Sequence, residues 1–94
     1  MTTKTFRFIF KERAHKKQEL IGKNCSIYLY KIGGPKLWTK EFIVDAGCWN
    51  GKTIEVNLEN VHWIVFEVAK LITYSTKADN LLSLSSGSNV EIEL

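Results

Sequence analysis

VHWIVFEVAKLITYS, residues 61–75, is the stretch on which the expected fold depends. Its aliphatic residues recur at helical spacing and would share one side of a helix. Asn57 or Asn60 can cap such a helix at its start. The pattern therefore predicts a helix from Val61 to Ser75. The residues of the stripe are Val61, Ile64, Val65, Val68, Leu71 and Ile72.

The opposite side of the expected helix carries Trp63, Phe66, Lys70 and Tyr74. One sheet can bury only one side of a helix, and large rings are costly to leave in water. We therefore predict that these four residues form a protein interface, covered by a second copy of the chain or by another protein. The alternative is that the leucines of residues 76–88, expected to form a loop with at most one helical turn, fold back over them.

Alternating patterns predict strands on both sides of this helix. Residues 37–49 and 53–58 read as a hairpin closed by Asn50-Gly51, because a tight type I′ turn favours this pair. The facing residues of that hairpin match only if Ala46-Gly47 forms a β-bulge. The other expected strands are residues 5–10, 25–32 and 89–94.

Residues 11–22, KERAHKKQELIG, contain good helix formers and end in a glycine suited to a helix C-terminus. They predict a short helix, although a mobile basic connection fits the same residues. Gly33-Gly34-Pro35 predicts a tight chain reversal.

These elements predict a single α+β domain over residues 1–94. The expected sheet is antiparallel, with about five strands around a three-strand meander, and one long helix packs on one face. A ferredoxin-like arrangement with an added hairpin strand is the nearest architecture, and parallel pairing of the first or last strand stays open.

Charge is distributed unevenly along the chain. Residues 1–40 carry ten basic and two acidic side chains, whereas residues 41–94 carry three basic and eight acidic ones. This asymmetry indicates an anionic partner, or two halves that neutralise each other in the fold. Tyrosine rings on an open sheet face could stack bases while basic residues contact phosphates. The expected nucleic-acid or anionic-partner site comprises Arg7, Lys11, Arg13, Lys16, Lys17, Lys23, Tyr28 and Tyr30.

No group of residues in the sequence indicates a catalytic site, a cofactor site or a metal site. Cys25 and Cys48 read as reduced thiols in strands, and His15 and His62 have no zinc-finger spacing. Residues 46–53 match a relaxed phosphate-loop pattern, but Lys52-Thr53 opens a strand by its alternation, whereas a phosphate loop opens a helix.

The 94 residues, 45% of them apolar, suit one core, and no apolar run is long enough to span a membrane. No secretory signal is visible, which predicts a cytoplasmic protein. We expect a small non-enzymatic binding protein, of the inhibitor or accessory-subunit type, that contacts a protein or nucleoprotein partner. The alternative is an RNA- or single-strand-binding module that uses the basic half and the open sheet face.

Overall fold

Strand β1 (Thr3–Lys11) lies at the centre of a three-stranded sheet, between β4 (Lys52–Asn57) and β7 (Asn89–Glu93). It runs antiparallel to β4 and parallel to β7. The computed structural model describes residues 3–70 and 72–94, without the side chains of residues 38, 72 and 73.

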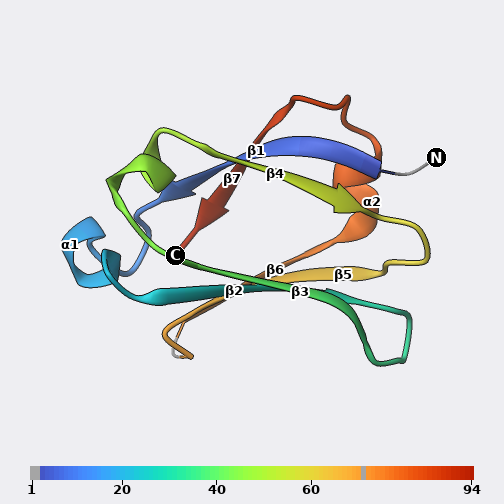
Figure 1. Cartoon of the computed structure of the whole chain (residues 1–94), viewed down its shortest axis with the longest axis horizontal. Coiled ribbons are helices and arrows are strands. Elements are labelled where there is room, and N and C mark those ends of the chain that lie inside the picture. Colours follow the sequence, from blue (N-terminus) through green and yellow to red (C-terminus); the bar gives the residue numbers. More distant parts are fainter. Residues whose placement is uncertain (1–2, 71) are drawn as a thin grey trace.

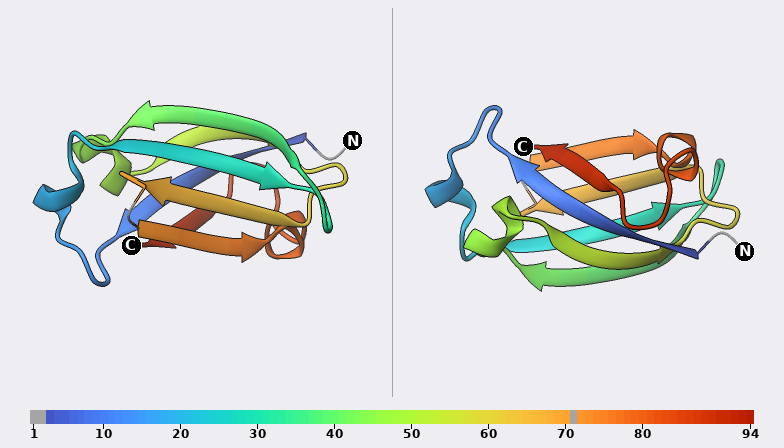
Figure 2. Two further views of the ribbon diagram at one scale, coloured as in Figure 1. Left: turned by 90° about the horizontal axis from the view of Figure 1, so that it is seen from below. Right: turned by 90° about the horizontal axis from the view of Figure 1, so that it is seen from above.

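A second sheet has four antiparallel strands in the order β3-β2-β5-β6. The two sheets lie one above the other as two layers (Figure 1). Figure 2 shows the outer side of the four-stranded sheet on the left and that of the three-stranded sheet on the right. The strands of the second sheet are β2 (Asn24–Tyr30), β3 (Lys36–Ile43), β5 (Trp63–Val68) and β6 (Ile72–Lys77).

The core lies between the two sheets, and alternation along the strands fills it. Phe6, Phe8 and Phe10 of β1 are all buried, as the period-two pattern predicts. The Phe8 ring meets the Phe66 ring of β5 edge-on, with centroids 5.0 Å apart. From the second sheet, the buried aliphatic residues among the described side chains are Ile27, Leu29, Ile64 and Val68.

The helix expected over residues 61–75 is wrong. This stretch forms β5 and β6, joined by a turn in which Ala69 and Lys70 have φ of 54° and 59°. Its apolar residues satisfy a helical period and a period of two at once. Pairing with β2 selects the strand, because it turns Ile64 and Phe66 into the core.

The expected α+β class and the ferredoxin-like arrangement are therefore also wrong. The described chain is mostly strand, and its α-helices are short: α1 (Lys17–Leu20) and α2 (Ala78–Leu82). Of the helix expected over residues 11–22, only α1 forms, anchored by the buried Leu20. Helix α2 matches the single turn expected within residues 76–88.

The hairpin at Asn50-Gly51 is wrong as well, and with it the three-strand meander. Strand β3 ends at Ile43, and a 3₁₀ helix, η1 (Ala46–Trp49), occupies the place of the expected bulge. The chain then crosses to the other sheet, where β4 pairs with β1. The reversal at Gly33-Gly34-Pro35 is confirmed, because β2 and β3 are antiparallel neighbours and Gly33 has φ of 60°.

Candidate binding surface on the four-stranded sheet

The outer face of the four-stranded sheet displays aromatic residues from two neighbouring strands. The inward positions of β2 and β5 are taken by core residues, so alternate positions point outward. These are Tyr28 and Tyr30 on β2, and Trp63 and Val65 on β5. All four side chains stay partly accessible, and Trp63 is 37% exposed.

Strand register aligns four of the outward side chains in one row across the sheet. Tyr30 pairs with Lys36 of β3 on one side, after a register shift between Leu29 and Tyr30, and with Trp63 on the other. Trp63 in turn pairs with Lys77 of β6. At the usual spacing between strands, the two terminal Cα atoms of this row lie about 14 Å apart. We call Lys36, Tyr30, Trp63 and Lys77 the Lys–Tyr–Trp–Lys row.

Side-chain contacts support the row from neighbouring positions. The Tyr28 and Tyr30 rings lie 6.1 Å apart between centroids, and the Lys36 ammonium lies 4.3 Å from the centroid of Tyr28. His62 packs its ring edge-on against Trp63 at 5.6 Å. The His62 backbone N–H donates to the Tyr30 carbonyl at 2.8 Å, which extends the strand pairing to the start of β5.

A shallow depression of about 420 Å³ lies at the middle of this row, beside the β2–β3 turn. Tyr30, Trp63 and Val65 supply its apolar lining, and Gly33-Gly34 leave one wall without side chains. Lys31 is the single charged residue among the described residues that line it. The depression can therefore accept an apolar group with negative charge nearby.

Carboxylates occupy the far part of the same face. Glu41 of β3 and Glu67 of β5 flank Ser26 of β2, and the Ser26 hydroxyl donates to Glu41 Oε1 at 3.4 Å. Ser26 and Tyr30 are four residues apart, so about 13 Å of strand separates this acidic row from the Lys–Tyr–Trp–Lys row. The outer face thus carries lysines at the end near the β2–β3 turn and a pair of carboxylates four residues away along β2.

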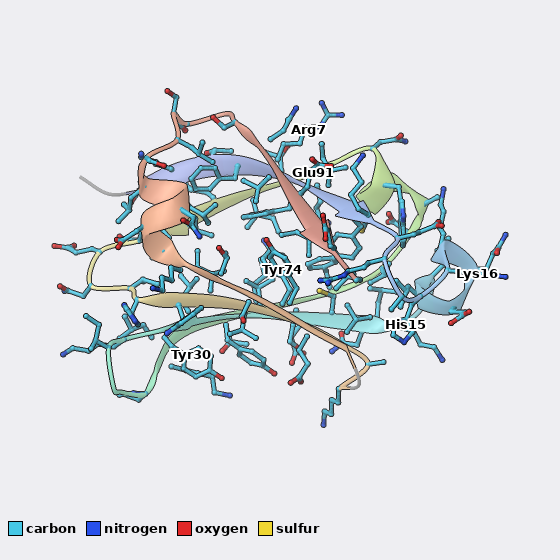
Figure 3. The ribbon with its side chains drawn as sticks, turned by 180° about the vertical axis from the view of Figure 1, so that it is seen from behind. Arg7, His15, Lys16, Tyr30, Tyr74 and Glu91 are labelled. Carbon is cyan, nitrogen blue, oxygen red and sulfur yellow. The ribbon has the colours of Figure 1, made fainter. Side chains whose placement is uncertain are left out.

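The four residues of the predicted protein interface do not form one surface. Phe66 is fully buried in the core, and the half-buried Tyr74 lies between the layers, its ring 6.4 Å from that of Phe66 (Figure 3). Lys70 is exposed in the β5–β6 turn. Trp63 alone lies on the outer face, because strand alternation separates it from Phe66.

The predicted nucleic-acid site is also divided. Arg7 lies on the outer face of the three-stranded sheet, opposite Tyr30 (Figure 3), and its guanidinium donates to the Asn50 carbonyl. Tyr28 and Tyr30 share the other outer face, as expected. Lys11 is at the end of β1, with its ammonium 3.4 Å from Glu91. Stacking rings and most of the basic side chains are therefore not brought together.

The basic connection between β1 and β2 lies at the end of the molecule away from the β2–β3 turn (Figure 3). Arg13, Lys16 and Lys23 are exposed there. Lys17, in α1, places its ammonium 5.5 Å from the Trp49 ring centroid. The backbone N–H groups of Arg13 and Ala14 both donate to the Leu94 carbonyl, which holds this connection against β7.

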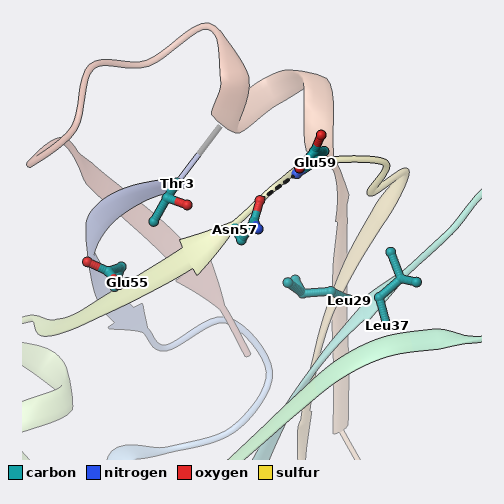
Figure 4. A pocket seen from close by; sticks show the side chains of 6 residues that line it. All are labelled: Thr3, Leu29, Leu37, Glu55, Asn57 and Glu59. Atoms are coloured by element: carbon teal, nitrogen blue, oxygen red, sulfur yellow. Dashed lines mark hydrogen bonds between the residues drawn. The ribbon is translucent and has the colours of Figure 1, made fainter. Parts of the chain in front are cut away.

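A second cleft, of about 330 Å³, lies where the edges of β3 and β4 face each other (Figure 4). Glu55 and Glu59 provide charge, and Leu29 and Leu37 form an apolar side. The Glu59 backbone N–H donates to the Asn57 side-chain oxygen at 3.0 Å. In the described part of the chain, no group of three or more His, Cys, Asp or Glu side chains could hold a metal ion.

The cysteines are free and buried. Burial raises the pKa of Cys25 from 9.0 to about 12, and the nearby Cys48 adds to the increase. Burial also raises the pKa of Cys48. Both thiols are therefore protonated near neutral pH and poor nucleophiles. Lys52 opens β4, as expected, so a strand follows this segment, whereas a phosphate loop is followed by a helix.

Sequence patterns place Tyr28 and Tyr30 in one predicted site and Trp63 in another, and they do not identify the neighbours of these residues on this face as site residues. Lys31, Lys36, Val65 and Lys77 belong to it through strand register and the β2–β3 turn. The Gly33-Gly34-Pro35 reversal was the available signal for Lys36, because it sets the residue opposite Tyr30.

Across residues 3–70 and 72–94, no helix has the length and hydropathy needed to cross a bilayer. Comparison of the chain with protein-family models, with curated proteins and with solved structures finds no match.

Proposed function

We propose that this chain is a non-enzymatic binding protein, of the inhibitor or accessory-subunit type, that recognises a protein partner through the outer face of its four-stranded sheet. The observation that carries the proposal is Trp63, 37% exposed beside Tyr30 over an apolar depression. Tryptophan and tyrosine dominate the binding energy of many protein interfaces. A partly exposed pair of these residues held on a hydrogen-bonded sheet needs little ordering when a partner binds.

The buried state of both thiols supports the non-enzymatic part of the proposal. A cysteine nucleophile needs thiolate character, and burial raises the pKa of Cys25 and Cys48 instead. His62 packs against Trp63 on the binding side. This arrangement suits a contact surface better than a general base beside a nucleophile.

A second candidate function is binding of single-stranded nucleic acid on the same face. It is favoured by the contact of Lys36 with Tyr28, which places a cation beside two rings that could stack bases. Glu41 and Glu67 weigh against it, because they would repel phosphates along the remainder of the face. Protein recognition is therefore the first proposal.

The test is affinity capture from the native host with immobilised wild-type protein and a Trp63→Ser variant, with and without nuclease. Thr53→Ser, at an exposed position of the three-stranded sheet, is the matched control. We expect a partner that survives nuclease, binds the control and is lost with Trp63→Ser. Loss of all partners after nuclease would instead support nucleic acid. Retention by Trp63→Ser would remove this face from the proposal.

A second copy of the chain is one protein that could cover the face. Sedimentation of the purified protein over a range of concentrations tests this directly. A dimer that is lost in Trp63→Ser but kept in Thr53→Ser would identify the partner as the chain itself. A monomer at all concentrations leaves a heterologous protein as the partner.

A further inference from the structure

We propose that the partner contacts the Lys–Tyr–Trp–Lys row with a short extended acidic segment, in which one apolar side chain lies between two carboxylates. The inference rests on the proposed function and specifies the chemistry of the partner. The apolar side chain would enter the depression between Tyr30 and Trp63, and the carboxylates would meet Lys36 and Lys77.

Charge on the outer face selects an acidic partner. Lys36 and Lys77 end the row, and Lys31 lines the depression. Among the described residues that line the depression there is no carboxylate. The acidic row of Glu41 and Glu67 lies about 13 Å away along the strands, beyond the screening length at physiological ionic strength. A negative segment at the row is therefore attracted, and one shifted along the strands is repelled.

The spacing of the row selects an extended segment with a defined pattern. In an extended chain, residues i, i+2 and i+4 point to the same side, and the outer two lie about 13 Å apart. The Cα atoms of Lys36 and Lys77 are separated by about 14 Å across the sheet. The matching pattern is acidic–x–apolar–x–acidic, with the segment crossing the strands.

Nucleic acid fits this charge pattern less well. A strand of nucleic acid carries one phosphate at every nucleotide and gains affinity from each cation that it meets. Beyond the row, however, the same face presents Glu41 and Glu67. The exposed cations Arg13, Lys16 and Lys23 lie at the other end of the molecule, past this acidic row. A short acidic segment uses the row without meeting the carboxylates.

The test is an NMR titration of the isotopically labelled full chain with synthetic heptapeptides. The first probe is Gly-Asp-Ser-Leu-Ser-Asp-Gly. The second replaces both Asp residues with Asn, the third replaces Leu with Ser, and the fourth places the two Asp residues side by side. We expect saturable shifts at Tyr30 and Trp63 with the first probe. Each lost charge contact should weaken binding by about two- to fivefold at low salt.

Two double variants distinguish a specific effect of the lysines in the row from a general effect of net charge. Lys36→Gln/Lys77→Gln and the control Lys16→Gln/Lys23→Gln change the net charge equally. Only the first pair should weaken binding of the acidic probe, and added salt should reduce the difference. Equal weakening by both pairs, or equal affinity for the Asp and Asn peptides, would overturn the proposal. The proposal would also be overturned if none of the four peptides caused chemical-shift changes on the outer face.

A labelled single-stranded RNA dodecamer provides the competing arm. Tighter binding of the RNA than of the acidic peptide, with shifts at the same row, would overturn the acidic segment in favour of nucleic acid. Affinity capture with the Trp63 and the Lys36/Lys77 variants distinguishes failure of the proposed function from failure of the acidic-segment inference. A protein partner that depends on Trp63 but not on Lys36 and Lys77 would keep the proposed function while this inference fails.

Discussion

Phe8 and Phe66 join the two sheets: their rings meet edge-on, with centroids 5.0 Å apart and ring planes at 61°. Phe8 belongs to the central strand of one sheet and Phe66 to an inner strand of the other. Both side chains are almost completely buried. An edge-to-face pair of this kind adds to the free energy of burying the two rings.

We expect Phe66→Ala to lower the free energy of unfolding by about 3–5 kcal/mol, because it leaves a cavity between the sheets. Trp63→Ala, on the outer face, should lower the free energy of unfolding by only about 1 kcal/mol. Urea titrations followed by circular dichroism measure both values. Similar losses for the two variants would mean that Trp63 is also part of the core.

Gly51→Ala should destabilise the protein by about 1–3 kcal/mol, because Gly51 has φ of 120°, which side-chain-bearing residues rarely adopt. A methyl group there would also lie 2.6 Å from Cγ of Arg7. Gly47→Ala is the control: Gly47 has no such φ, and the nearest neighbour of the added methyl group, Asp45 Oδ1 at 3.0 Å, belongs to an exposed side chain. In thermal melts, the melting temperature of Gly51→Ala should be clearly lower than that of Gly47→Ala. The reverse order would contradict this geometry.

Stability should fall between pH 9 and about 12. Below pH 9 the Cys25 thiol is protonated in both states, but above it the thiol ionises in the unfolded chain while the pKa of about 12 keeps it protonated in the fold. Proton release then favours unfolding, by up to about 1.4 kcal/mol per pH unit. Urea midpoints measured across this range should decline less steeply in Cys25→Ala. Parallel curves for the variant and the wild type would exclude Cys25 as the source.

Lys4→Met should loosen the segment that follows α2. The Lys4 ammonium donates to the carbonyls of Leu82 and Leu84, at 2.7 and 2.6 Å. Loss of these charge-assisted bonds should cost about 1.5–3 kcal/mol and speed hydrogen exchange in residues 84–88. Lys11→Met is the control, because the exposed ion pair of Lys11 with Glu91 contributes less than about 1 kcal/mol. Unchanged exchange in Lys4→Met would show that these bonds do not hold the segment.

Strands with one unambiguous period were predictable from the sequence. Phe6, Phe8 and Phe10 alternate with other residues and point into the core, and the Cys25–Leu29 alternation does the same. Each of these patterns fits a strand and lacks a helical stripe. The two strands that anchor the sheets were therefore placed correctly, and so was the reversal after Tyr30.

The secondary structure of the stretch from Trp63 to Tyr74 could not be predicted from the local sequence pattern. Its apolar residues fit two periods, and its turn uses Ala69 and Lys70 in left-handed conformation, where sequence rules look for Asn or Gly. Asn50-Gly51 carries the expected hairpin signal but lies where the chain crosses between sheets. Which strands pair depends on contacts distant in sequence, so the Lys–Tyr–Trp–Lys row could not be assembled from local patterns.

During synthesis on the ribosome, the longest delay between two strands that pair is the one between β1 and β7. The last residue of β1, Lys11, is separated from the start of β7 at Asn89 by most of the polypeptide. At about 5–20 residues per second, this interval lasts roughly 4 to 16 s. The strands of the four-stranded sheet are complete at Lys77, before β7 exists. We expect the nascent chain to be most prone to aggregation in this interval, while at least one edge of β1 is unpaired.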